Sequence, residues 1–179
     1  HADFVVRDAE VGTGIATPVI DADGNNSIII IPRANMRLTI ANVEKAASAI
    51  AEADVLLLQL EVPIEPSKRA AEIAGENSTV VILNPAPACQ IPNEFLKFVD
   101  YLTPNEIETE MLTGVKVSDQ SGAEQAARVL LDKGMSAVVL TLGSRGTLLL
   151  TKNTTVSVPA HKVNVVDTTA AGDAFCGGF

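Results

Sequence analysis

An aspartate follows a run of small residues near the end of the chain, in the stretch Asp167–Phe175, which reads DTTAAGDAF. The three small residues before Asp173 would let backbone N–H groups approach an anion at the start of a helix; they are Ala170, Ala171 and Gly172. A carboxylate beside such an anion hole suits phosphoryl transfer to an alcohol, because it accepts the hydroxyl proton while the amides hold the phosphoryl oxygens. The same pattern is also expected of a tight turn in which Asp173 is an ordinary first-turn acid.

Two further stretches carry polar groups at suggestive spacings. Asn105 and Glu108 stand three residues apart, so that they share one face of a helical first turn, although acids there also complement the helix dipole. Thr141–Gly146, TLGSRG, has two glycines and one arginine directly after an apolar run. Alone, it is typical of a tight turn between two strands. It is not a Walker A loop, since the chain has no Gly-Lys-Ser/Thr.

These three motifs, in this order, resemble the signature of the ribokinase-like (PfkB) carbohydrate kinases, and within that family the ribokinases. The resemblance runs from about Gly14 to Phe179, and three other stretches support it: Leu58–Glu61 (LQLE), Asn84–Ala88 (NPAPA) and Thr103–Glu106 (TPNE). Several ordered motifs are more specific than any one of them.

The resemblance implies a division of roles around Asp173, which becomes the catalytic base and a substrate contact, with the anion hole formed by the backbone of Ala170, Ala171 and Gly172. Glu61 becomes a ligand of the sugar. Because Glu61 ends an apolar run, its carboxylate needs a partner, and an ion pair with a nearby Lys or Arg would serve equally well. Asn84 either orients polar groups in the same crevice or caps the loop after it.

The family also uses ATP and Mg²⁺, and the resemblance implies K⁺ as a possible further cofactor. The residues implied in ATP binding are Asn105, Thr141, Leu142, Gly143, Ser144, Arg145, Gly146 and Gly172. Arg145 would offset triphosphate charge or remain a solvated surface residue. Glu108 would act on Mg²⁺ through water, since Mg²⁺ prefers oxygen ligands and keeps much of its hydration. Asp167 and Thr169 match the positions of a monovalent-cation site.

The function expected from these motifs is ATP-dependent phosphorylation of a sugar's primary hydroxyl, with ribose converted to ribose 5-phosphate. The alternatives within the family are fructose, a ketodeoxy acid or a nucleoside as the acceptor. Outside it, the chain could be a catalytically silent module that binds a nucleotide or a sugar. A dinucleotide-binding oxidoreductase is disfavoured, because no early Gly-x-Gly-x-x-Gly unit follows a strand.

The elements that would position these motifs alternate between strands and helices. Apolar runs predict strands at 55–60, 79–83, 101–103, 137–142 and 163–166, the first of them covered on both sides, with a hairpin at 147–151 and 154–158. Helical patterns fall at 39–53, 66–75, 93–98, 106–112, 123–133 and from 174 onward. This order predicts an α/β fold, a mostly parallel sheet with helices on both faces. Each motif then lies at the carboxyl end of a strand, where such folds bind ligands.

The chain is expected to have two parts. Residues 15–20 and 27–31 flank a turn-rich segment containing Asp23-Gly24, which predicts a hairpin. Residues 1–38 would then form part of a small β lid, and residues 39–179 a kinase core that is incomplete at its C-terminus. Both ends look cut, so we expect a piece of a longer protein that is inactive alone.

Composition limits the partners. A net charge of −9 and 3% aromatic residues disfavour nucleic acid, and no apolar run reaches the roughly 20 residues that span a bilayer. Cys89 and Cys176 have no metal spacing and suit a reducing cytoplasm, while His1 and His161 have no catalytic or metal spacing. The expected partners are therefore a sugar and ATP, and the resemblance implies a homodimer in the full-length protein.

Overall fold

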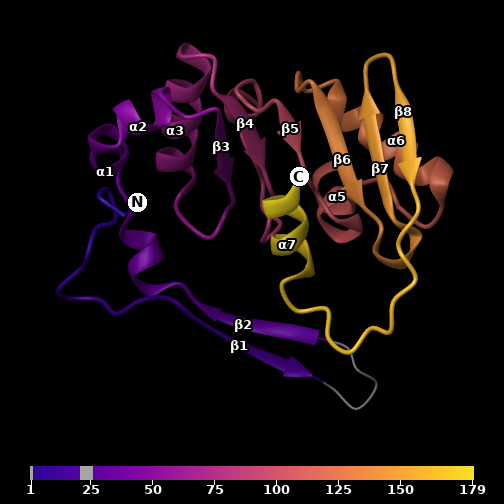
Figure 1. The fold of residues 1–179 in the computed structure, drawn as a ribbon, viewed down its shortest axis with the longest axis horizontal. Helices are drawn as coiled ribbons and strands as arrows, with labels where there is room; N and C mark the ends of the chain where they lie inside the picture. Colours follow the sequence, from indigo (N-terminus) through magenta and orange to yellow (C-terminus); the bar gives the residue numbers. More distant parts are fainter. Residues whose placement is uncertain (1, 21–25) are drawn as a thin grey trace.

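The computed structural model describes residues 2–20 and 26–179, which form two separate sheets. The smaller sheet pairs β1 (Ile15–Ile20) with β2 (Asn26–Ile31) in antiparallel register, Ile15 opposite Ile31. It projects from the body of the molecule (Figure 1). The two predicted hairpin strands are confirmed, whereas His1 and most of the turn expected between the strands lie outside the described residues.

The larger sheet has six strands in the order in which they occur along the chain. They are β3 (Val55–Leu58), β4 (Val80–Leu83), β5 (Tyr101–Leu102), β6 (Ala137–Thr141), β7 (Thr147–Thr151) and β8 (Thr155–Val158). The first four run parallel, and β7 and β8 are antiparallel additions at one edge. The prediction of a mostly parallel α/β sheet is confirmed, and the carboxyl ends of β3 to β6 meet along one edge.

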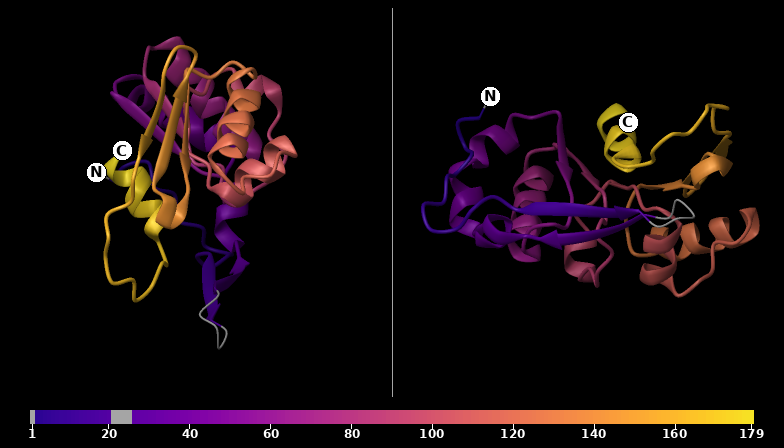
Figure 2. Two further views of the ribbon diagram at one scale, coloured as in Figure 1. Left: turned by 90° about the vertical axis from the view of Figure 1, so that its right-hand side faces the viewer. Right: turned by 90° about the horizontal axis from the view of Figure 1, so that it is seen from below.

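Helices flank this sheet unequally. They are α1 (Ile40–Lys45), α2 (Ala47–Ala51), α3 (Ile64–Glu76), α4 (Asn93–Leu96), α5 (Glu106–Thr113), α6 (Gln120–Leu131) and α7 (Ala171–Gly178), with the 3-10 turns η1 (Arg33–Arg37) and η2 (Gly143–Arg145). Helices α5 and α6 cover one face, and α7 lies on the other (Figure 2). None of the helices in the described part is long and apolar enough to cross a membrane.

The main core lies between the sheet and α3, α5 and α6. It buries alternate residues of neighbouring strands, Leu83, Leu102, Leu140 and Leu148 among them. Each such side chain contributes about 2 kcal/mol of hydrophobic stabilisation when it leaves water. This rigid layer fixes where the strand ends lie, and therefore where the polar residues that follow them can meet.

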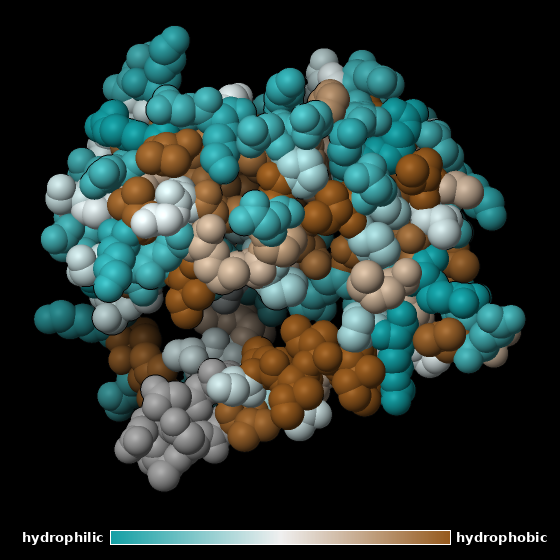
Figure 3. Space-filling view, turned by 180° about the vertical axis from the view of Figure 1, so that it is seen from behind, coloured by the Kyte–Doolittle hydropathy of each residue, from teal (hydrophilic) through white to brown (hydrophobic). Residues whose placement is uncertain are grey.

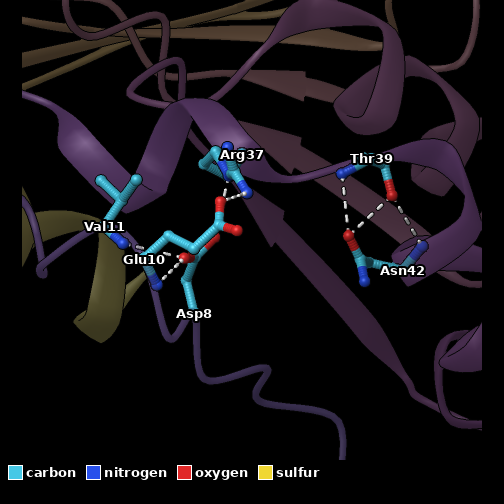
Figure 4. A network of polar contacts seen from close by, with 6 residues as sticks. All are labelled: Asp8, Glu10, Val11, Arg37, Thr39 and Asn42. Atoms are coloured by element: carbon cyan, nitrogen blue, oxygen red, sulfur yellow. Dashed lines mark hydrogen bonds and ion pairs between the residues drawn. The ribbon is translucent and has the colours of Figure 1, made fainter.

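A polar cluster ties the two stems of the lid together at its base (Figure 4). The Asp8 carboxylate accepts the backbone N–H groups of Glu10 and Val11 at 2.8 and 2.9 Å, and Arg37 Nε at 2.9 Å. Arg37 also donates to the Glu10 carboxylate at 3.0 Å. The two backbone hydrogen bonds, with a smaller contribution from Arg37, lower the pKa of Asp8. The segment that enters the lid is thus joined to η1, where the chain leaves it.

Three expectations about individual elements are wrong. The single helix expected over 39–53 is interrupted at Ala46, whose φ of −95° and ψ of 4° separate α1 from α2. The break lets Val43 and Ile50 both pack against Ala70 and Ile73 of α3, so tertiary packing overrides the helix propensity of this alanine-rich stretch.

The strand expected over 55–60 ends at Leu58, and it is not covered on both sides. It is an edge strand, and Val55 and Leu57 remain about half exposed while Leu56 and Leu58 pack into the core. An uninterrupted apolar run is typical of a parallel strand. The apolar run alone, however, cannot show that one face of β3 stays exposed in the described part of the chain.

The strand expected over 163–166 is also absent. Val163, Val165 and Val166 lie in an extended connection and are strongly exposed, Val166 to 97%. The connection from β8 to α7 swings away from the sheet (Figure 1), so these residues have no neighbouring strand with which to pair in the described structure. Local β propensity cannot form a strand without a partner.

Candidate active site

A cavity of about 200 Å³ lies where the ends of β4, β5 and β6 meet the start of α7. Asn84, Thr103 and Thr141 line it from the strand ends, and Asn105 and Glu108 from the start of α5. The opposite wall is the segment from Thr168 to Asp173. Motifs as far apart in the sequence as Asn84 and Asp173 are therefore brought to one place, at the carboxyl edge that the sequence indicated.

The small-residue loop forms the N-terminus of α7. Ala170 precedes the helix in the left-handed region, with φ 60° and ψ 13°, and the N–H of Ala171 donates to the Thr168 carbonyl at 3.1 Å. The N–H groups of Gly172 and Asp173 belong to the first turn, which has no helical carbonyls to bond. A Cβ on Gly172 would meet no atom within 4 Å. Glycine here leaves open space beside two donors, as an anion hole requires.

Asp173 is exposed and lines the cavity beside these donors. Asp167 has a different position, because its Oδ1 accepts the Thr169 N–H at 2.8 Å and so shapes the turn. That hydrogen bond is the main cause that lowers the pKa of Asp167. Thr169 lines the cavity, whereas Asp167 is not among the lining residues.

Asn105 and Glu108 form a reciprocal cap on α5. Asn105 Oδ1 accepts the Glu108 N–H at 2.8 Å, while the backbone N–H and Nδ2 of Asn105 donate to the two carboxylate oxygens at 2.8 and 2.9 Å. Such a capping box stabilises the helix start by about 1 kcal/mol. Glu108 is 7% exposed, and burial raises its pKa, opposed by the Asn105 N–H. The pair is therefore structural and also lines the cavity.

A second cavity of about 640 Å³ adjoins the first and shares Asn105, Thr141, Ala171, Gly172 and Phe175 with it. Gly143 and Gly146 line it, with φ of 53° and 96°. A Cβ on Gly146 would lie 2.0 Å from the Val158 carbonyl oxygen, so both conformation and space require glycine there. The parallel bridge between Asn105 and Thr141 holds the two loops side by side.

Other predicted site residues do not line either cavity. Leu142 is buried, Ser144 is exposed, and neither they nor Arg145 line either cavity. Arg145 contacts Glu106 and the Val117 carbonyl instead. Glu61 is half-buried after β3 and lines neither cavity, and its N–H is held by Gln59 Oε1 at 2.6 Å.

Six residues that line the smaller cavity were missed by sequence reasoning as site residues: Ile28, Ala86, Thr103, Thr168, Phe175 and Cys176. Ile28 comes from β2, so the lid reaches the site, but an isoleucine within an apolar hairpin gives no sign of this. Thr103 could have been found as the polar residue directly after β5. Its Oγ1 lies 3.4 Å from Cys176 Sγ, which connects α7 to the sheet.

The profile of the pfkB family of carbohydrate kinases matches residues 1–179, and the chain belongs to that family. It is 43% identical over 176 residues to ribokinase of Staphylococcus aureus (strain COL), covering 98% of this chain and 58% of that protein. It is 39% identical over 168 residues to deoxyribokinase of Salmonella typhi, covering 93% and 55%.

Solved structures agree with this assignment. The structure of Arabidopsis thaliana ribokinase complexed with ribose and ATP matches with a TM-score of 0.83 and 32% identity, over 93% of this chain and 55% of that one. The chain thus spans little more than half the length of the relatives that it matches.

Proposed function

We propose that the intact protein transfers the γ-phosphoryl group of ATP to the primary hydroxyl of ribose, giving ribose 5-phosphate and ADP. The observation that carries this proposal is the smaller cavity, which Asp173 lines together with Gly172 from the first turn of α7 and with Glu108. A carboxylate next to oriented N–H donors is the arrangement that phosphoryl transfer to an alcohol needs. Membership of the pfkB family supports the same reaction class.

In this proposal Asp173 accepts the hydroxyl proton as the sugar oxygen forms its bond to phosphorus and the bond to the ADP oxygen breaks. The N–H groups of Gly172 and Asp173 hold the oxygens of the transferring group. The loop at 141–146 and Asn105 bind the nucleotide from the adjoining cavity. Ile28 closes the small cavity from the lid side, and Asn84 contributes a polar group from the end of β4.

The donor set suits a hydrated divalent cation. Among the residues that the structure describes, no three His, Cys, Asp or Glu side chains gather as a metal cage. Mg²⁺ in kinases is held by few carboxylates together with waters and phosphates, so the single buried Glu108 fits that role through water. The cation would offset the negative charge of the phosphates. Asp167 and Thr169 would offer oxygens to K⁺, and Glu61 would contact the sugar.

A homodimer is proposed for the intact protein, supported by the apolar surface of the lid. Ile29 and Ile31 alternate with Ile28 along β2, so they lie on the face opposite the cavity, and both are about half exposed. Hydrophobic side chains gather over this small sheet in Figure 3. An apolar patch of this kind is typical of an interface.

Turnover by the intact protein tests the function. ADP formation with ribose, deoxyribose, fructose, a ketodeoxy acid and a nucleoside should give the highest kcat/KM for ribose. Deoxyribose is the second candidate, because the chain is 39% identical to a deoxyribokinase. A higher kcat/KM for any other acceptor would replace ribose. Calorimetric binding of Mg²⁺–ADP without turnover of any sugar would instead indicate a silent binding module.

A further inference from the structure

One guanidinium group joins three segments beside the larger cavity. Arg145, the last residue of η2, donates from Nη2 to the carboxylate of Glu106, the first residue of α5. The same Nη2 donates to the Val117 carbonyl at 2.8 Å, in the connection between α5 and α6. Neither cavity is lined by Arg145. Its charge is therefore committed to the protein rather than to the space where a triphosphate would lie.

Val117 is held from both sides. Its N–H donates to Glu110 Oε1 at 2.8 Å, while its carbonyl accepts from Arg145. Glu106 and Glu110 stand one turn apart on α5, so they share a face of that helix. Val117 itself is 3% exposed, which makes this peptide a fixed point. Arg145 thus connects the η2 loop to a rigid unit formed by α5 and the segment after it.

The η2 loop closes the hairpin between β6 and β7, and the Asn105–Thr141 bridge lies at its start. The backbone hydrogen bonds inside the loop are local: Arg145 N–H to the Leu142 carbonyl at 3.0 Å, Gly146 N–H to the Gly143 carbonyl at 3.1 Å and Leu142 N–H to the Gly146 carbonyl at 2.8 Å. Gly143 and Gly146, which line the larger cavity, flank the arginine. Glu106 also lines this cavity, and without Arg145 its carboxylate would repel a bound triphosphate.

We propose that Arg145 is a positioning residue for the nucleotide: it fixes the loop of Gly143 and Gly146 against α5 and neutralises Glu106, without contacting the phosphates. This inference rests on the proposed function of the site as an ATP site. Removal of the Glu106 charge distinguishes this proposal from a direct contact between Arg145 and phosphate. If Arg145 bound phosphate directly, loss of its Glu106 partner would leave it free to bind ATP more tightly. If Arg145 positions the loop, loss of Glu106 releases the loop and ATP binds less tightly.

Steady-state kinetics on the intact protein separate the two. Arg145→Gln should raise the KM for ATP about tenfold, with kcat and the sugar KM within about twofold. Glu106→Gln should also raise the KM for ATP, and the double variant should be no worse than Arg145→Gln, since the two residues form one unit. Arg145→Lys should be intermediate, because lysine lacks the planar fork. Arg128→Gln, an exposed arginine on α6, is the matched control and should behave as wild type.

Tighter or unchanged ATP binding in Glu106→Gln, with weaker binding in Arg145→Gln, would overturn the inference in favour of a direct phosphate contact. Hydrogen exchange of the amides at 143–146 without ligand gives a readout independent of catalysis. Arg145→Gln and Glu106→Gln should both speed exchange there, and Arg128→Gln should not. Unchanged exchange in both variants would reject the positioning role, even if the protein proves not to be a kinase.

Discussion

The two walls of the small cavity differ in how firmly they are held. On the strand-end wall, Thr103 and Glu108 are buried and Glu108 is bonded through both carboxylate oxygens. On the α7 wall, the residues from Thr168 to Asp173 are all exposed. The contacts that hold α7 include the Thr103–Cys176 pair and the edge-to-face contact of Tyr101 with Phe179, whose ring centroids lie 5.6 Å apart. Positioning groups thus occupy the rigid wall, while the proposed base and anion hole occupy the loosely held one.

The largest effect is expected from the exposed wall. Asp173→Asn removes the proposed base without disturbing packing, so turnover should fall about 100- to 10,000-fold while nucleotide binding and thermal stability stay near wild type. Single-turnover kinetics and calorimetry with Mg²⁺–ATP measure the two quantities. Near-normal turnover would show that Asp173 is not the catalytic base. The exposed wall would then not be the one that carries the catalytic residue.

Glu108→Gln tests the rigid wall. Glutamine retains the size and part of the capping box but loses the charge, so the Mg²⁺ concentration for half-maximal activity should rise about tenfold. A titration of activity against Mg²⁺ at saturating ATP checks this. An unchanged metal requirement would leave Glu108 with its capping role alone.

Glu108→Gln should also change how the stability of the protein depends on pH. Burial raises the pKa of Glu108, opposed by the Asn105 N–H, so the folded protein binds this proton more tightly than the unfolded chain does. Its contribution to stability is present below the unfolded-state pKa and is lost as pH rises through the higher folded-state pKa. In urea unfolding across about pH 4 to 7, Glu108→Gln should therefore lose less stability than wild type as pH rises. Parallel curves for the two proteins would contradict this.

A smaller effect is expected where the walls touch. Thr103→Val keeps the shape but removes the hydroxyl that contacts Cys176 and the Leu83 carbonyl, at a cost of about 1 kcal/mol. Because α7 loses an attachment, kcat should fall as well. Thr79→Val is the matched control, since Thr79 is equally buried but bonds Ile50 and Ala53 at the opposite end of β4. Equal losses of kcat in both variants would show that the Thr103 contact does not matter to α7.

The smallest effect concerns the backbone of the loop. Ala170 has a φ of 60°, a conformation that costs a non-glycine residue roughly 1 kcal/mol. Ala170→Gly should therefore be at least as stable as wild type, whereas Ala171→Gly, in the first turn of α7, should lose about 0.5–1 kcal/mol. Chemical denaturation measures the free energy of unfolding of both variants. A lower value for Ala170→Gly than for wild type would show that the backbone is not strained at this position.

The sequence predicted correctly those features that depend on a local pattern of residues. The buried runs of β4 and β6 and the polar residues after them predicted both the sheet and the edge at which Asn84, Asn105 and Thr141 meet. It failed where the outcome depends on distant partners. The valines at 163–166 have strand propensity but no neighbouring strand in the described structure, and Ile28 lines the cavity only because the lid extends toward it.

The cross-linked stems of the lid limit how it could open. Asp8 and Arg37 join the segment that enters the lid to the segment that leaves it, and β1 and β2 pair beyond them in continuous register from Ile15–Ile31 to Ile20–Asn26. The two strands of the hairpin are therefore expected to move together. A sugar would gain access when the whole hairpin rotates as a rigid body about a hinge in the chain before Asp8 and after Arg37. Ile28 would then leave the cavity and return to it in a single movement, at the same time as the rest of β2.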